Sequence, residues 1–176
     1  SNGKNHVEDA LGHGTHVSGI IADLTPSNVK LIPIKVIEDN NKGNLSSSVM
    51  ALLYIADLKE TKGINICAAN LSLGSTNTIA IGSSFHKSFT DATQTARKQN
   101  ISIIVAAGNS QNDCKNYCPA NIEDAITVSN MTSSHTKSSS SCYGSFIDLT
   151  APGHEIYSTA INGGFKYLSG TSMAAP

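Results

Sequence analysis

The sequence lacks an excess of charge of either sign. Lys and Arg total 12, Asp and Glu total 13, and charged residues make up only 14% of the 176 residues. Because no basic block exists, neither nucleic acid nor an anionic membrane is expected as the main partner. Hydrophobic residues reach 39%, which is too high for a chain that is disordered throughout.

Long apolar runs are also missing. No run approaches the ~18 residues that a membrane span needs, and residues 1–6 contain no apolar core of a signal peptide. The sequence has neither an internal repeat nor a linker, and 18.4 kDa is the size of one domain with a sizeable core. Since it starts without Met and stops at Pro176, we expect a piece of a longer protein.

Cysteines are too few for a disulfide scaffold. Cys67 lies in the apolar run 64–69 and is predicted to be buried and reduced. Cys114, Cys118 and Cys142 lie in polar surroundings, so one disulfide among these three is expected if the protein is exported. A zinc site is less favoured, because no CxxC pair is present.

The apolar pattern alternates between strand-like and helix-like segments. Strands are predicted at residues 29–37, 64–73 and 101–106, and shorter ones at 125–128, 146–149 and 155–157. Helices are predicted from about residue 13, from about residue 45 with Asn44 or Ser46 as N-cap, and over residues 85–96. Strands separated by helices of this length predict an α/β fold with a parallel sheet.

Three short segments carry the residue types of nucleophilic catalysis. They read Gly-His-Gly-Thr-His-Val-Ser-Gly at 12–19, Val-Ala-Ala-Gly-Asn-Ser at 105–110 and Gly-Thr-Ser-Met-Ala-Ala-Pro at 170–176. A serine hydroxyl needs an adjacent base, and histidine is the usual one. An asparagine after a buried strand can donate to a forming oxyanion. A metal site at His13 and His16 is disfavoured, because no third ligand follows.

Together and in this order, the three segments resemble the motifs of the subtilisin-like serine proteases, or subtilases. The resemblance runs from about His13 to Pro176 and implies a three-layer, parallel-sheet α/β fold of the subtilisin type. It further implies that His13 is the general base, Ser172 the nucleophile and Asn109 the side-chain oxyanion donor. His16, the second histidine of its motif, is then structural.

Lesser matches point to the binding surface. By resemblance, Ser72, Leu73 and Gly74 would pair with an extended substrate as an added strand, and Ala106, Ala107 and Gly108 would line the primary specificity pocket. Residues 41–43 lie where the family has the opposite binding strand. The resemblance also places an Ala-Pro-Gly turn at 151–153 and a tight proline turn at Cys118-Pro119, which is predicted to be a cis peptide.

The sequence departs from the family pattern in its acid. The subtilase triad runs Asp, His, Ser along the chain, yet only 12 residues precede His13 and none forms an apolar strand ending in Asp. Asp9 is too close to His13 for that role, and Asp148 comes in the wrong order, so both are interpreted as structural. We therefore expect a partial catalytic domain over residues 1–176. It is incomplete at both ends, lacks the strand with the catalytic Asp and the helix after Ser172, and is inactive alone.

The resemblance also implies partners and leaves alternatives. Polypeptide substrates, a pro-segment outside the chain and a secreted or extracytoplasmic location are expected. No cofactor is expected, and no metal either, because residues 21–28 are too short for the calcium loop that many family members carry after the histidine helix. An α/β-hydrolase is disfavoured, because it needs G-x-S-x-G with His after Ser. A catalytically inactive subtilase homologue that serves as a binding domain stays open, since the residue that ends the upstream strand would decide it.

Overall fold

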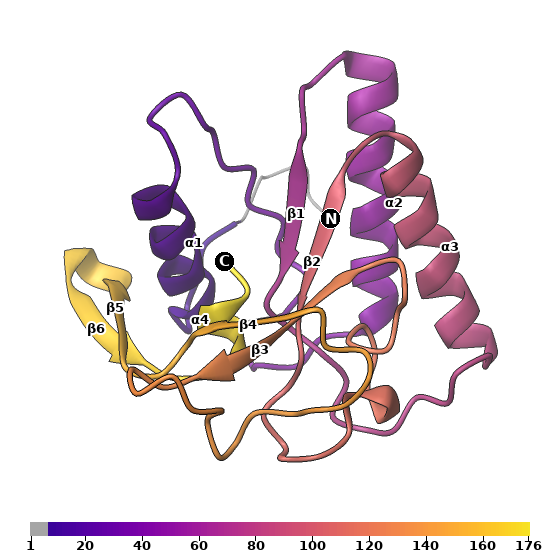
Figure 1. Ribbon diagram of the computed structural model, residues 1–176. Coiled ribbons are helices and arrows are strands. Elements are labelled where there is room, and N and C mark those ends of the chain that lie inside the picture. Colours follow the sequence, from indigo (N-terminus) through magenta and orange to yellow (C-terminus); the bar gives the residue numbers. More distant parts are fainter. Residues whose placement is uncertain (1–6) are drawn as a thin grey trace.

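The computed structural model describes residues 7–176, so the statement on residues 1–6 above lies outside it (Figure 1). The helices are α1 (His13–Leu24), α2 (Leu45–Lys62), α3 (Ser84–Lys98) and α4 (Thr171–Ala174), with 3-10 turns at Cys114–Asn116 and Ile161–Gly163. The strands are β1 (Ala68–Leu71), β2 (Ser102–Ala106), β3 (Ile126–Met131), β4 (Leu149–Pro152), β5 (Ile156–Thr159) and β6 (Phe165–Leu168). No helix in this part of the chain is both long and apolar enough to span a bilayer.

The centre of the molecule is a parallel sheet of four strands in the order β1-β2-β3-β4. Side chains alternate between the two faces of a strand. Ile103 and Val105 of β2 therefore join the core beneath α2 and α3, whereas Ile104 and Ala106 pack on the opposite side with Ala174 of α4. Figure 1 shows α2 and α3 on one face and α1 and α4 on the other, which confirms the predicted three-layer α/β arrangement.

Two features of α2 follow from the local sequence. The side chain of Asn44 accepts a hydrogen bond of 3.0 Å from the Ser46 amide, so Asn44 is the N-cap. Gly63 ends the helix in the left-handed conformation, with its N–H donating to the Leu58 carbonyl. Between these caps, Leu52 packs with Phe89 of α3 in the main core.

The predicted strand at residues 29–37 does not form. Only Ile37 makes a bridge, to Gly43, and no other residue of this segment pairs with a described strand. Its apolar side chains stay accessible; Ile32, for example, is 47% exposed. A β-branched segment becomes a strand only when a neighbour takes up its backbone N–H and C=O groups, so the prediction was wrong for the described chain.

Three other strand predictions need shifts. The strand predicted at 64–73 narrows to β1, and that at 125–128 extends to Met131 as β3. The strand predicted at 146–149 instead begins at Leu149 as β4, because Ile147 N–H closes a turn to the Gly144 carbonyl. β4 continues through Ala151 to Pro152, where only Gly153 of the predicted turn lies outside the strand. Proline is tolerated there because β4 is an edge strand.

The cysteine predictions were wrong in two respects. All four cysteines lie in the described chain and all are free, so no disulfide joins them. Cys67 lies just before β1 and is exposed. Successive side chains of an extended chain point in opposite directions, and Ile66 is the one that packs in the core. Burial raises the pKa of Cys118 to about 12 and, with the Asp113 charge, that of Cys114 to about 11, so both thiols stay protonated at neutral pH.

Candidate active site

Ser172 lies in the first turn of α4. Its hydroxyl is 3.4 Å from the Ser72 carbonyl oxygen, and the Ser72 hydroxyl donates to the Ser172 carbonyl over 2.8 Å. Ser72 directly follows β1. The serine is thus tied to the carboxyl end of a sheet strand, the edge at which parallel α/β sheets gather functional groups.

The start of α1 carries His13, and α1 packs against α4. Val17 and Ile20 of α1 form a buried cluster with Met173, the residue after Ser172. His13 lies one turn before Val17 and keeps part of its surface in contact with solvent. Within residues 7–176 no hydrogen bond joins His13 to Ser172, so the two predicted catalytic side chains belong to packed elements without being linked directly.

The electrostatic surroundings of His13 act in opposite directions. The protein around the ring removes water from it, which lowers the pKa of the imidazole, and the Asp9 carboxylate opposes that change. His16 and Lys166 lower the pKa further by charge repulsion. The net effect is a pKa below the ordinary value of 6.5, so His13 is neutral and able to accept a proton at neutral pH.

His16 has the structural position that the resemblance implied. It is fully buried, and its Nε2 lies 3.1 Å from the carbonyl oxygens of both Ile156 and Lys166. These carbonyls belong to β5 and β6, so the imidazole ties the antiparallel hairpin to α1. Its Nε2 is therefore engaged with the backbone, whereas its buried Nδ1 has no hydrogen-bond partner among the described residues.

Asn109 faces the residues just before Ser172. Its side-chain oxygen accepts from the Thr171 amide at 2.9 Å and from the Thr171 hydroxyl at 3.2 Å. Because the oxygen is occupied in this way, the amide nitrogen of the same side chain is left as a donor beside Gly170. A β-carbon at Gly170 would lie 3.3 Å from that nitrogen. The backbone of Gly170 has a φ of 153°, which favours glycine.

Thr171 has a function that sequence reasoning missed, although it stands inside the quoted serine motif. It is fully buried, and its hydroxyl also accepts a hydrogen bond of 3.1 Å from the Gly108 amide. Thr171 therefore connects the segment of Asn109 to that of Ser172. A polar residue within a Gly-Thr-Ser turn is the signal that could have found it.

The predicted pocket residues lie next to this connection. Ala106 ends β2, and Ala107 is buried with Cys114 and Cys142. Gly108 has a φ of 102°, and a β-carbon there would lie 3.2 Å from the sulfur of Cys142. Two backbone hydrogen bonds fix this segment. The Ala107 amide donates to the Val128 carbonyl, and the Cys142 amide donates to the Gly108 carbonyl.

Ser72, Leu73 and Gly74 continue from the end of β1. The chain beyond them is held by the Ser75 amide, which donates to the Cys118 carbonyl over 2.8 Å. The Cys118-Pro119 peptide is cis, which confirms that prediction. Residues 41–43 lead out of a tight turn and do not form a strand. The Glu38 amide donates to the Lys42 carbonyl, Asn41 has a φ of 60°, and Gly43 makes a single antiparallel bridge to Ile37.

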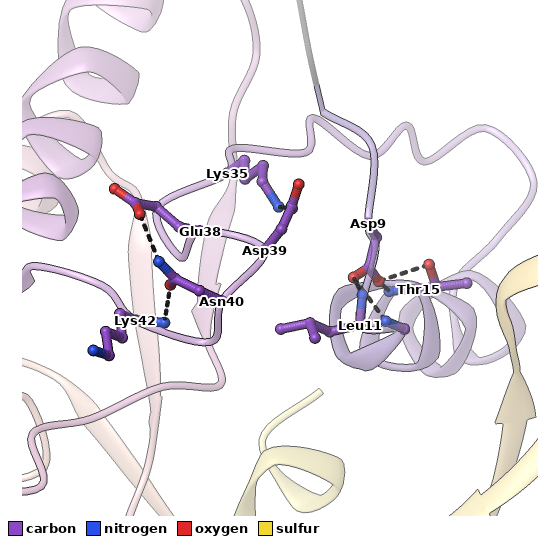
Figure 2. A network of polar contacts seen from close by, with 9 residues as sticks. Asp9, Leu11, Thr15, Lys35, Glu38, Asp39, Asn40 and Lys42 are labelled. Carbon is purple, nitrogen blue, oxygen red and sulfur yellow. Dashed lines mark hydrogen bonds and ion pairs between the residues drawn. The ribbon is translucent and has the colours of Figure 1, made fainter.

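The two carboxylates that sequence reasoning set aside differ in their surroundings. Asp148 accepts a hydrogen bond of 2.7 Å from the Thr127 amide and serves to align β3 with the start of β4. Asp9 instead binds the first turn of α1 with both oxygens (Figure 2). An aspartate just before a helix start is a recognisable capping signal. Among residues 7–176, no three His, Cys, Asp or Glu side chains converge as metal ligands.

The comparisons with known proteins agree with the arrangement of these segments. A family model described as the subtilase family matches residues 1–176. The chain belongs to the subtilase family. This subtilase chain is 37% identical over 173 residues to alkaline serine exoprotease A of Vibrio alginolyticus, and 35% identical over 176 residues to subtilisin-like protease 3 of Trichophyton tonsurans.

Solved structures show the same fold. A cold-adapted subtilisin-like serine proteinase superimposes with a TM-score of 0.81 at 35% identity, covering 96% of this chain and 59% of that one. A protease of Pseudoalteromonas arctica superimposes with a TM-score of 0.79 at 29% identity, covering 93% of this chain and 55% of that one. The fold is therefore subtilisin-like α/β. The match to the Vibrio relative includes 97% of this chain but only 30% of that protein. The match to the Trichophyton relative includes 98% of this chain and 42% of that protein.

Proposed function

We propose that the protein carrying this chain is a serine endopeptidase that hydrolyses peptide bonds through an acyl-enzyme. The observation that carries the proposal is the connection of Asn109, Thr171 and Ser172. The Asn109 oxygen is held by Thr171, the residue before Ser172, so the amide nitrogen of Asn109 stays free to donate next to the serine segment. Membership of the subtilase family and relatives named serine proteases support the same reaction.

Each residue has a chemical role in this proposal. His13 takes the proton of the Ser172 hydroxyl as its oxygen attacks the scissile carbonyl carbon, and later gives that proton to the leaving amine. The carbonyl oxygen becomes an oxyanion, which accepts hydrogen bonds from the Asn109 amide and the Ser172 backbone N–H. Water then hydrolyses the acyl-enzyme.

We infer further that the chain is part of a larger catalytic domain. β1 pairs only with β2 and leaves its outer edge unpaired within the described residues, and the segment 29–37 has no strand partner there. One additional strand would pair with both, and in the proposal that strand ends in the triad Asp. The carboxylate would hold His13 in the correct tautomer and stabilise its imidazolium, so residues 1–176 alone are expected to be inactive.

The substrates in this proposal are polypeptides bound as an added strand. Ser72, Leu73 and Gly74 would supply the backbone groups for pairing, and Ala106, Ala107 and Gly108 would form a wall of the primary pocket. A pro-segment outside the chain and export from the cytoplasm belong to the same proposal.

A fluorophosphonate probe tests the proposal in the full-length protein. The probe reacts with a serine hydroxyl only when a base and an oxyanion site activate it. We expect labelling at Ser172, identified by peptide mass spectrometry, and none in Ser172→Ala. Ser110→Ala, which changes a different hydroxyl, serves as the control and should label normally. A folded, processed protein that resists the probe would instead be an inactive homologue.

A further inference from the structure

Asp9 makes four hydrogen bonds around the first turn of α1 (Figure 2). Its Oδ1 accepts from the Gly12 amide at 2.8 Å and from the Leu11 amide at 3.1 Å. Its Oδ2 accepts from the Thr15 amide at 2.7 Å and the Thr15 hydroxyl at 2.8 Å. One carboxylate thus spans the residues before and after His13.

These bonds satisfy donors that the helix itself cannot. The first four amides of a helix have no partner within it, and Gly12, the N-cap residue, has no side chain to cap with. Burial by itself would raise the pKa of Asp9, but the hydrogen bonds from Thr15, Gly12 and Leu11 outweigh it and lower the pKa to about 2. The side chain is therefore a carboxylate throughout the pH range in which a histidine titrates.

The far side of the same turn is also fixed. The Thr159 hydroxyl of β5 donates to the Thr15 carbonyl over 2.8 Å, and the Ser158 hydroxyl donates to the His16 carbonyl over 2.8 Å. The backbone of His13 is therefore held between the Asp9 carboxylate on one side and β5 on the other.

The charges that face His13 come from few groups. Asp9 is the one negative group that acts on its imidazole among the described residues, and His16 and Lys166 act in the opposite sense. Of the elements packed against α1, β5 adds only the exposed phenol of Tyr157, and α4 carries no titratable side chain. Among the described residues, removal of the Asp9 charge would leave no negative group acting on the His13 imidazole.

We infer that Asp9 is a positioning residue for the general base: its carboxylate fixes the turn that carries His13 and stabilises the imidazolium formed when His13 takes the Ser172 proton. The inference rests on the proposed function. It assigns this role to a carboxylate separate from the triad Asp expected upstream, because both Asp9 oxygens are already occupied by α1.

The test compares variants of the full-length protein. Asp9→Asn keeps the size and one acceptor but removes the charge, whereas Asp9→Glu keeps the charge and lengthens the side chain. Thr15→Val removes only the hydroxyl bond to Oδ2. The matched control is Asp124→Asn, which removes a carboxylate bound to Arg97 and Gln94, away from α1.

Two readouts are needed, the pH profile of kcat/KM and the titration of the His13 imidazole by NMR. In Asp9→Asn we expect the acidic midpoint of both to fall by about 0.5 pH unit at low salt, because a charge that favoured the imidazolium is gone. We expect kcat to fall about 10-fold with KM little changed. Asp9→Glu should restore the midpoint but not kcat, and Thr15→Val should lower kcat without moving the midpoint.

Other results would overturn the inference. The inference fails if the pH midpoint and kcat of Asp9→Asn match those of the Asp124→Asn control. It also fails if Asp9→Asn lowers the melting temperature but leaves the midpoint unmoved, which is the result expected of a purely structural cap. If Asp9→Asn does not fold, unchanged kinetics in both Asp9→Glu and Thr15→Val would have the same force. Failure of the proposed function looks different, because the unmodified protein would then not react with the fluorophosphonate while the NMR midpoint still reports on Asp9.

Discussion

At the scale of single residues, the orientation of Asn109 decides what it can do. A turn-forming asparagine bonds its own backbone nearby, but here the side-chain oxygen is taken by Thr171, more than sixty residues further along. The amide nitrogen is thereby left to donate. In the transition state the scissile oxygen carries more charge than in the ground state, so such a donor lowers the barrier more than it improves binding.

Asn109→Leu in the full-length protein tests this orientation. We expect kcat to fall by roughly 10²–10³ with KM little changed, a magnitude that the same kind of change has in subtilisin itself. The melting temperature should be measured in parallel, since loss of the Thr171 bond alone affects stability. An unaltered kcat with a lower melting temperature would remove Asn109 from the oxyanion site.

At the scale of elements, α1 depends on its contact with β5. Gly19 faces that strand, and a β-carbon there would collide with the hydroxyls of Thr159 and Ser158. These hydroxyls are the ones that donate to the carbonyls of Thr15 and His16. The helix that carries His13 can approach the hairpin this closely only because residue 19 has no side chain.

Gly19→Ala is therefore expected to destabilise the protein by about 1–3 kcal/mol, the usual range for overpacking. In an exposed helix the same change would stabilise by about 0.5–1 kcal/mol, because alanine is the better helix former. The measurement is the free energy of unfolding by denaturant. Gly164→Ala, with no atom within 4 Å of the new β-carbon, is the control and should be nearly neutral. A more stable Gly19→Ala would contradict the close packing.

The sequence predicted most of these elements because their signals are local. Apolar residues at helical spacing and the N-cap candidate Asn44 predict α2 without reference to any distant contact. Strand boundaries were less accurate, since the start of β4 depends on how Asp148 bonds the Thr127 backbone on another strand. Pairing of that kind is not written in the sequence of either segment.

At the scale of the whole molecule, one edge of the sheet remains open. β1 has a partner on one side only, and no backbone amide of residues 30–36 donates a hydrogen bond to any described residue. Apolar side chains in and beside this segment are exposed, including Leu31 at 41% and Val29 at 39%. Unpaired backbone beside exposed apolar side chains is what an absent neighbouring strand would leave.

Hydrogen exchange in the full-length protein tests this interpretation. If a further strand completes the sheet, amides within 30–36 should exchange as slowly as those of β2, because both then open only with the core. The protected amides of the buried residues Ile103 and Val105 provide the internal reference. Exchange within seconds in 30–36, with β2 still protected, would show that no strand pairs there and would remove the support for a larger domain.

The sequence by itself predicted most of the helices and sheet strands, the family and, by resemblance, the proposed roles of His13, Asn109 and Ser172. Periodicity, caps and motifs are properties of neighbouring residues, and they survive without coordinates. Only the tertiary structure decided that Thr171 orients Asn109, that Asp9 fixes the turn of His13, that Cys67 is exposed and that residues 29–37 stay unpaired. Each of these depends on which distant group supplies a hydrogen bond or covers a side chain, and that is settled only when the layers pack together.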